Sequence, residues 1–388
     1  MKRLLTIVLA VLLMFSLIAC SSTPAPQENT PSTPSATPDA KPNTPAAAPS
    51  KLEEFKAKNY KLAYVFLGTT TDIFQMAFDG ATRTAEALNM TVDIFTCSDD
   101  DVRFQETINT CANQNYDGIF ISHGRQEYSY DLIKSVVEKG IKVATFDTQL
   151  VDSSGNKTEI EGVTQMFQND QMMADQLLDY VCNVLYPDKV AAGEKINILK
   201  IWRGPGISPF DRRQETYLKY EEAGLINTLE VIGPIDLQNV ESSMQAVTAT
   251  TLTKYPVGTI DAIWSAYDAY ARGAYVALND AGRTDVPLVT VDISNQDIQF
   301  MLQGINGEKV WKACSAVHFA TVGEQGIRLL IQKLAGDPTP SVYNLTPSLV
   351  VYDQLSAGSN VLNLGETVQG YGVNDDNVSD WAKEALLG

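Results

Sequence analysis

The sequence predicts an α/β protein built from two doubly wound, Rossmann-like lobes, each with a parallel sheet covered by helices. Short apolar runs alternate with segments whose apolar residues recur at helical spacing. This alternation occurs twice, with a break near Gly162. The chain has 388 residues, and at about 150 residues per domain that length also favours two domains. Two successive series of strand and helix indicate two parallel sheets.

The first series begins near Tyr60. Apolar runs predict its four strands, at Lys61–Leu67, Thr91–Phe95, Gly118–Ser122 and Val143–Asp147. Between these strands the apolar residues follow helical spacing, and three helices are expected at 74–88, 104–111 and 130–139.

The second series repeats the pattern. Its strands are expected at Asn197–Trp202, Leu229–Ile232, Ala262–Ser265 and Pro287–Asp292, and its helices near 169–185, 211–223, 240–255 and 268–281. A last helix is expected at 380–387. Ligands of such sheets bind beyond the carboxyl ends of the strands, so two facing lobes should form a binding cleft there.

The N-terminus carries a targeting signal. Lys2 and Arg3 precede an apolar run from Leu4 to Ala19, which ends at Cys20. The run could barely cross a bilayer core of about 30 Å, so a simple membrane anchor is the alternative interpretation. However, Leu17-Ile18-Ala19-Cys20 resembles the lipobox of bacterial lipoproteins. This resemblance implies that residues 1–20 form a signal peptide, cleaved before Cys20, whose thiol then carries the lipid.

A tether follows the lipid site. Pro, Ser, Thr and Ala make up 24 of the 30 residues from Ser21 to Ser50. Such a segment cannot bury enough apolar area to offset the entropy of ordering it, so residues 21–55 are expected to be a disordered spacer. Two or three acyl chains on Cys20 would hold the protein stably at the membrane.

Composition and motifs exclude several function classes. The net charge is −18, and the mature chain without Lys2 and Arg3 would carry −20, which argues against nucleic-acid binding. The sequence contains no phosphate loop, nucleophile elbow or HExxH motif. His123 and His318 are its only imidazoles. We therefore expect no enzyme activity, cofactor or metal. The cysteines at 97, 111, 182 and 314 are interpreted as buried thiols rather than disulfides or nucleophiles.

The body of the chain resembles the ribose/galactose-type periplasmic sugar-binding proteins, the substrate-binding lipoproteins of ABC importers. This family shares its fold with the cores of LacI-type repressors. The similarity covers residues 60–352, and no DNA-binding helix-turn-helix precedes them, which excludes a repressor. The motifs that carry it are Thr71-Asp72-Ile73-Phe74, Phe78-Asp79-Gly80-Ala81, Tyr116-Asp117-Gly118-Ile119, Val143-Ala144-Thr145-Phe146-Asp147, Tyr267-Asp268 with Gly273-Ala274, and Val291-Asp292.

The resemblance implies a type I periplasmic binding protein fold, in which the chain crosses three times between lobes. We place the crossings near Gln165, His318 and Thr346. The N-terminal lobe would then comprise residues 56–165 and 318–346. The C-terminal lobe would comprise residues 166–317 and 347–388.

A sugar site needs polar groups for the hydroxyls and aromatic rings for the C–H faces of the ring. The resemblance implies Phe74 as a stacking ring and Asp147 and Asp292 as hydroxyl acceptors in a hydrated, open cleft. The alternatives are a core role for Phe74 and helix capping for Asp147 and Asp292. Asp268 is interpreted as a helix cap. The other candidates are Thr71, His123, Arg125, Tyr267 and His318, of which His123 and Arg125 could equally be solvated rim residues.

Departures from the family pattern leave the ligand open. Thr148-Gln149 stands where many sugar binders have an arginine. The family has another arginine after the glycine turn, and in this chain that position falls on Asp211 or Arg213. The family's second stacking ring would fall within Leu237–Asn239, which has no aromatic residue, and Trp202 or Phe210 could substitute for it. An unusual sugar, a sugar derivative and a non-sugar ligand all remain open.

The predicted function is that of an extracytoplasmic solute-binding lipoprotein, lipid-anchored at a bacterial cell membrane and monomeric. It would capture a small polar ligand, in first place a sugar, and deliver it to the membrane subunits of an ABC permease. The alternatives are a sensor or chemotaxis component, and a nucleoside or sugar-like signal molecule as ligand.

Overall fold

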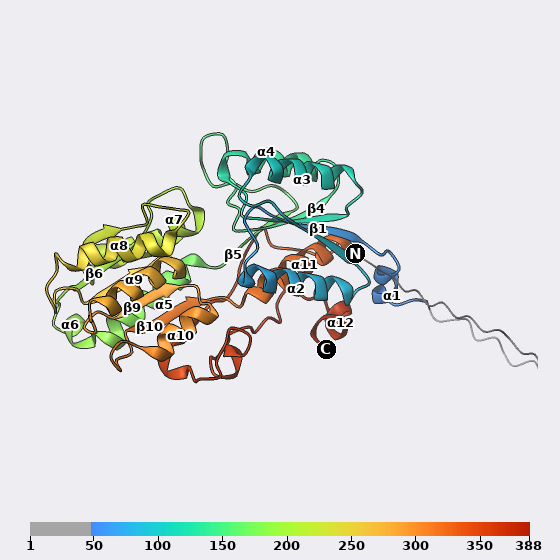
Figure 1. The fold of residues 1–388 in the computed structure, drawn as a ribbon. Coiled ribbons are helices and arrows are strands. Elements are labelled where there is room, and N and C mark those ends of the chain that lie inside the picture. Colours follow the sequence, from blue (N-terminus) through green and yellow to red (C-terminus); the bar gives the residue numbers. More distant parts are fainter. Residues whose placement is uncertain (1–47) are drawn as a thin grey trace, which may run out of the picture. The chain divides into compact units, whose positions relative to one another are not determined.

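The computed structural model describes residues 48–388, so the predicted signal peptide, Cys20 and most of the tether lie outside the described residues. The expected disordered spacer extended too far, because residues 51–55 belong to a helix that is capped by Ser50 and buries Phe55. The described chain contains two six-stranded sheets, with strand orders β11-β5-β4-β3-β1-β2 and β12-β10-β9-β8-β6-β7 (Figure 1). All neighbours pair in parallel except β10 and β12, which are antiparallel. The two doubly wound lobes that the sequence predicts are therefore present. None of the helices within residues 48–388 has the length and apolarity that a membrane span requires.

The strands of the first sheet are β1 (Lys61–Phe66), β2 (Thr91–Thr96), β3 (Gly118–Ser122), β4 (Lys142–Phe146), β5 (Val163–Phe167) and β11 (Val342–Asn344). Those of the second sheet are β6 (Ile196–Ile201), β7 (Ile226–Ile232), β8 (Ala262–Ser265), β9 (Leu288–Val291), β10 (Trp311–Ala316) and β12 (Ser348–Val351).

The α-helices are α1 (Lys51–Lys56), α2 (Asp72–Glu86), α3 (Asp101–Asn113), α4 (Gln126–Val137), α5 (Asp170–Asp179), α6 (Pro187–Ala191), α7 (Ser208–Glu222), α8 (Val240–Leu252), α9 (Asp268–Asp280), α10 (Asn295–Gln303), α11 (Phe319–Ala335) and α12 (Lys383–Leu387). Helix α5 continues as one π-helical turn, η1 (Tyr180–Leu185). Short 3₁₀ turns lie at η2 (Tyr352–Gln354), η3 (Leu364–Glu366) and η4 (Asp380–Ala382).

Helices cover both faces of the first sheet. Helices α3 and α4 lie on one face, and α2 and α11 pack against each other on the opposite face (Figure 1). The α2–α11 contact is close because a glycine from each helix meets the backbone of the other. A Cβ on Gly80 would collide with the carbonyl of Ala320, and one on Gly323 with the carbonyl of Ala77. Only glycine permits this approach.

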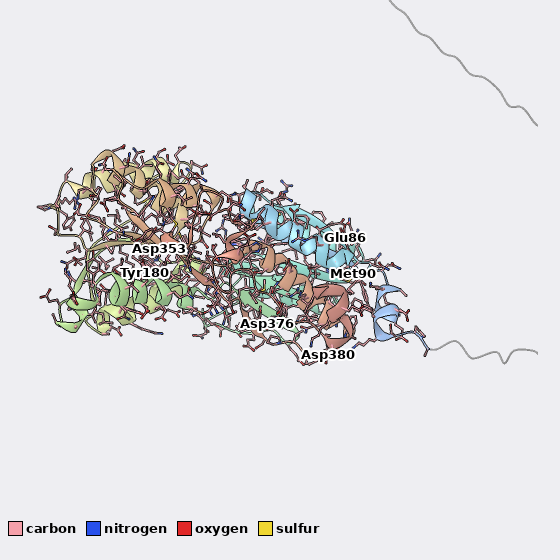
Figure 2. The ribbon with its side chains drawn as sticks, turned by 90° about the horizontal axis from the view of Figure 1, so that it is seen from below. Glu86, Met90, Tyr180, Asp353, Asp376 and Asp380 are labelled. Carbon is pink, nitrogen blue, oxygen red and sulfur yellow. The ribbon has the colours of Figure 1, made fainter. Side chains whose placement is uncertain are left out.

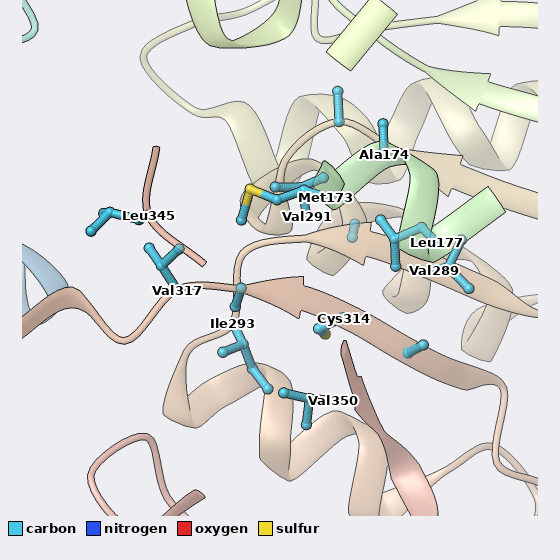
Figure 3. Close-up of a cluster of buried hydrophobic side chains, with 14 of the residues drawn as sticks. Met173, Ala174, Leu177, Val289, Val291, Ile293, Cys314, Val317, Leu345 and Val350 are labelled. Atoms are coloured by element: carbon cyan, nitrogen blue, oxygen red, sulfur yellow. The ribbon is translucent and has the colours of Figure 1, made fainter. Parts of the chain in front are cut away.

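The second sheet is covered in the same way, with α5 and α7 on one face and α8, α9 and α10 on the other (Figure 1). Figure 3 shows Met173 and Leu177 of α5 packed near Val289 and Val291 of β9. All four side chains are fully excluded from solvent. This apolar contact fixes the start of α5, where Asp170 lies, against the sheet.

The chain passes three times between the two sheets. It passes from β5 to α5 after Phe167, from β10 to α11 after Ala316, and from β11 to β12 after Asn344. Gln165, where we expected the first crossing, lies inside β5 and pairs with Thr145 of β4. Strands β5 and β10 have no counterpart among the predicted strands, because polar residues interrupt their short sequences, VTQMF and WKACSA.

The end of the chain differs from the expected boundary, which assigned 347–388 to the C-terminal lobe. Asp353 lies by Tyr180 in that lobe, whereas Asp376 and Asp380 lie beside the first lobe (Figure 2). Gln325 of α11 donates to the carbonyl of Asp376 at 3.1 Å. The Trp381 indole donates to Asp337, just after α11, at 2.8 Å. The C-terminal segment therefore runs from the second lobe to the first.

Candidate ligand-binding site

Three predicted site residues follow directly after strands, at the carboxyl ends of the sheets. His123 follows β3, Asp147 follows β4 and Asp292 follows β9. Their φ angles are 65°, 44° and 69°, in a left-handed region that non-glycine residues adopt rarely and at a cost of about 1–3 kcal/mol. Such strain persists where the surrounding structure imposes it, and it is common at functional sites.

A chain of alternating charges joins the two lobes. Asp147 of the first lobe accepts from the Nη2 of Arg212 on α7 at 2.6 Å. The Nε of Arg212 donates to Asp170 at 2.7 Å, and the Nε of Arg213 donates to the other oxygen of Asp170 at 2.8 Å. Arg213 then lies 3.8 Å from Asp292. We call these five residues the charge network.

The charge network is almost fully buried. The side chains of Asp147 and Asp170 are inaccessible to solvent, and those of the two arginines are no more than 5% exposed. Ions that lose water in this way stay charged only when partners of opposite sign surround them. Each guanidinium has further acceptors, because Arg212 donates to Ser208 at 2.6 Å and Arg213 donates to the carbonyl of Ala266. The three carboxylates and these further acceptors therefore hold both guanidinium groups in fixed positions.

Two buried acceptors at the charge network have no partner among the described residues, Oδ1 of Asp292 and Oε1 of Gln168. The amide of Gln168 donates to Asp147 at 2.9 Å, which turns its oxygen away from that carboxylate. An unpaired buried acceptor costs about 1–3 kcal/mol. Both atoms are thus poised to accept hydrogen bonds from a donor that enters from outside the protein.

Aromatic rings from the first lobe form one wall near the charge network. The ring of Phe74 lies 4.1 Å from Phe66, 5.4 Å from His123 and 5.5 Å from Phe319. The Nδ1 of His123 lies 2.7 Å from the hydroxyl of Ser122. Burial, together with the positive charge of Arg212, lowers the pKa of His123 to about 4. His123 is therefore a neutral ring at pH 7.

The second lobe contributes its own rings. Phe210 of α7 lies 6.2 Å from Tyr267, and the guanidinium carbon of Arg213 lies 5.5 Å from the centre of the Phe210 ring. Tyr267 is 37% exposed, so part of its ring remains free for contact. Of the two rings considered as substitutes for the missing aromatic, Phe210 packs against this site. Trp202 lies instead beside Lys200 of β6.

Two cavities lie between the lobes. One, of about 270 Å³, is lined by Leu67, His123 and Asp147 from the first lobe and by 206–209 from the second. The other, of about 610 Å³, is lined by Thr71, Ile73 and Met76 of the first lobe and by residues of the second that include Tyr267. Both lobes thus contribute walls to each cavity, as a cleft at the carboxyl ends of the strands requires.

The matching family model is the periplasmic binding protein domain, and it aligns with residues 62–338. The chain belongs to the periplasmic binding protein family. Proteins of this family bind solutes and are not enzymes, and the two described lobes have the type I fold. A search of curated proteins gave no match.

Solved structures agree with this assignment. A sugar ABC transporter protein from Yersinia enterocolitica is 32% identical and has a TM-score of 0.72, over 89% of this chain and 99% of that one. A 5-methylthioribose transporter solute-binding protein from Thermotoga lettingae is 24% identical, with a TM-score of 0.70 over 85% and 97%. An Agrobacterium vitis solute-binding protein with bound allitol is 20% identical, with a TM-score of 0.62 over 79% and 97%.

The structure of this binding protein brings some of the predicted residues together and leaves others apart. Asp147, Asp292 and Arg213 meet in the charge network, with Phe74, His123 and Tyr267 in the two aromatic walls. Thr71 lines the cavity of about 610 Å³, and Arg125 lines that of about 270 Å³.

The remaining candidates have local partners. Arg125 donates from Nε to both oxygens of Asp101, at 2.8 and 2.9 Å. Asp211 accepts from the backbone N–H of Gly206 at 3.0 Å and so holds its own loop. The ring of His318 lies 5.3 Å from Tyr371. Thr148, at the position of the absent arginine, is buried and accepts from the N–H of Gly124 at 2.9 Å.

Sequence reasoning missed Arg212, Asp170 and Gln168. Asp170 and Gln168 follow β5, which was not predicted as a strand, so its carboxyl end was not searched for site residues. Arg212 adjoins Arg213 in the sequence, and the family pattern pointed to a single arginine. Two adjacent arginines in the first turns of a helix after a strand are the signal that could have found it.

Within residues 48–388 no group of three or more His, Cys, Asp or Glu side chains is placed so that it could hold a metal ion. The four cysteines in this part of the chain are free and buried, as their interpretation as thiols predicts.

The pKa of Asp292 makes the stability of the binding protein depend on pH. Burial raises this pKa to about 7, against the opposing effect of Arg213. Between about pH 4 and pH 7 the native carboxyl therefore holds a proton that the unfolded chain has lost, and the native state is stabilised as the pH falls. Asn cannot ionise. We therefore expect the unfolding free energy of Asp292→Asn, measured relative to that of the wild type, to be about 2–3 kcal/mol higher at pH 8 than at pH 5.

Urea unfolding at the two pH values measures this gain. Asp285→Asn is the control, because Arg283 lowers the pKa of Asp285, which is therefore ionised in both states throughout this range. A relative stability of Asp292→Asn that stays constant with pH would contradict the assignment.

Proposed function

We propose that this binding protein captures a sugar in the cleft between its lobes and delivers it to an ABC permease. The observation that carries the proposal is the pair of unpartnered buried acceptors, on Asp292 and Gln168, beside two preset guanidinium groups. A sugar hydroxyl can both donate and accept a hydrogen bond. One hydroxyl could therefore donate to an unpartnered acceptor and accept a hydrogen bond from an arginine at the same time.

The aromatic walls support the same ligand class. Phe74 in one lobe and Tyr267 in the other offer ring faces, and C–H faces of a sugar pack against such rings. The neutral His123 adds a polar edge without a charge. Similarity to the Yersinia sugar ABC transporter protein, over nearly the whole of both chains, favours a sugar over the other candidates.

A thermal-shift screen of residues 51–388 against pentoses, hexoses, polyols and nucleosides tests this function. A ligand that binds only the native state raises the unfolding midpoint by mass action. We expect a sugar to give the largest shift, at one site per chain, and to be recovered chemically unchanged after long incubation. Shifts only with non-sugars, or a converted sugar, would contradict the proposal.

We further propose that a lipid on Cys20 anchors the protein to the outer side of the cell membrane, with residues 21–50 as spacer. The lipobox-like Leu17-Ile18-Ala19-Cys20 supports this. Cys20→Ala should prevent lipid labelling and should either release the protein or block its processing. The purified full-length Cys20→Ala protein should still unfold at the wild-type temperature, since the spacer separates Cys20 from the two lobes. A lipid-labelled Cys20→Ala protein would contradict the anchor.

A further inference from the structure

Apolar side chains from both lobes line part of the cavity of about 610 Å³. Ile73 and Met76 line it from the first lobe, and Tyr267, Val361 and Leu362 line it from the second. Leu362 is 72% exposed, although it is a large apolar side chain. Apolar surface gathered in a cavity is typical of a ligand-binding site rather than of ordinary protein surface.

The charged residues of this cavity are already paired. Arg272 donates to Asp268 at 2.7 Å, to Glu241 at 2.6 Å and to Asp297 at 3.1 Å. Asp268 is also held by the N–H of Ala269 at 2.7 Å, and it is buried. The cavity thus offers a ligand apolar contact rather than a free charge.

The cavity shares Tyr267 with the aromatic wall that the second lobe contributes to the proposed sugar site. Arg213 of the charge network donates to the carbonyl of Ala266, the residue before Tyr267. Ile73 precedes Phe74, whose ring forms the aromatic wall of the first lobe. A ligand held at the charge network could therefore extend into the cavity without leaving the cleft.

One wall of the cavity comes from the C-terminal segment. The N–H of Val361 donates to Asn295 of α10 at 2.9 Å, which fixes the backbone next to Leu362. Val361 and Leu362 lie beyond the part of the chain that the family model matches, residues 62–338. The apolar wall is therefore formed by a segment outside the matched binding domain.

From these contacts we infer that the ligand is a sugar carrying an apolar substituent, and that this cavity, the substituent pocket, holds the substituent. The inference rests on the proposed function, which places the polar part of the ligand at the charge network. An alkyl or aryl group would cover Leu362 and Met76, and the apolar area that this contact removes from water would increase the affinity for the ligand.

Calorimetric titration with matched probes tests the inference. The probes are D-ribose and D-glucose, each compared with its methyl, butyl and phenyl glycosides. In at least one series we expect the butyl or phenyl glycoside to bind about ten- to a hundredfold more tightly than the free sugar. Leu362→Asp and Met76→Gln should each reduce this ratio. Val257→Asp, at a side chain that is also 72% exposed but does not line the pocket, should leave it unchanged.

The outcomes separate the two proposals. Equal affinity for free and substituted sugars would overturn the substituent pocket and leave sugar binding intact. So would a preference for substituted sugars that persists in both pocket variants. Binding of none of the probes, together with no thermal shift from any pentose or hexose in the screen, would overturn sugar capture, and the substituent pocket with it.

Discussion

Replacing Asp170 with asparagine should lower the free energy of unfolding by about 3–5 kcal/mol. Asp170 is the central acceptor of the charge network, since one of its oxygens accepts from Arg212 and the other from Arg213. Without its negative charge, two buried guanidinium groups would share the remaining carboxylates, Asp147 and Asp292. Removing one partner of a buried ion pair is costly because the other charge stays desolvated.

Urea unfolding of the ligand-free protein measures this effect, with Asp179→Asn as the matched control. Asp179 ends the same helix, α5, but its side chain is exposed and accepts only from Asn183, at 2.6 Å. The control should change the unfolding free energy by less than about 0.5 kcal/mol. A similar small effect for Asp170→Asn would show that the arginines are hydrated in solution, and that the charge network does not hold the lobes.

Much of the fold could be predicted because parallel strands buried on both faces have strongly apolar sequences. The strands at 61–66, 118–122 and 262–265 are of this kind, and each was expected within one or two residues. Strand β10 shows the limit. Its sequence, WKACSA, is less apolar than a central strand usually is, and the strand is recognised only from its pairing with β9 and β12.

The candidate site was predictable where a residue follows a recognised strand. Asp147 and Asp292 were found in this way, because the carboxyl ends of parallel strands meet at the ligand edge. Arg212 could not be separated from Arg213 by this argument, since both lie on a helix that starts several residues after β6. Which of two neighbours reaches across to the other lobe depends on tertiary contacts that no local pattern encodes.

The sequence also led us to expect hydrated carboxylates in an open cleft, and in this respect the structure is different. Asp147 is 3% exposed and Asp292 is 7% exposed. Asp147 already accepts from Arg212 of the opposite lobe, so the two lobes are joined through a buried ion pair in this structure. Loss of Asp147 should therefore destabilise the ligand-free protein as well as weaken ligand binding, because Arg212 would lose a buried partner.

We expect Asp292 to contribute to ligand affinity directly, and Asp147 to contribute mainly through its ion pair with Arg212. Asp292 has an unpartnered oxygen, whereas both oxygens of Asp147 are engaged, by Arg212 and Gln168. Asp292→Asn should weaken binding of the sugar that gives the largest thermal shift by about 1.5–3 kcal/mol, or roughly ten- to more than a hundredfold in dissociation constant. Asn retains one acceptor oxygen, so Asp292→Ala should cost more than Asp292→Asn.

Calorimetric titration of Asp292→Asn and Asp147→Asn, beside urea unfolding of each variant without ligand, separates these roles. For Asp292→Asn we expect the loss to fall mainly on affinity, because its nearest cation, Arg213, keeps its bond to Asp170. For Asp147→Asn we expect losses in both measurements, since its carboxylate pairs with Arg212 across the cleft. Near-wild-type affinity in both variants would mean that the strand-end carboxylates serve only the charge network, and that the sugar is bound elsewhere in the cleft.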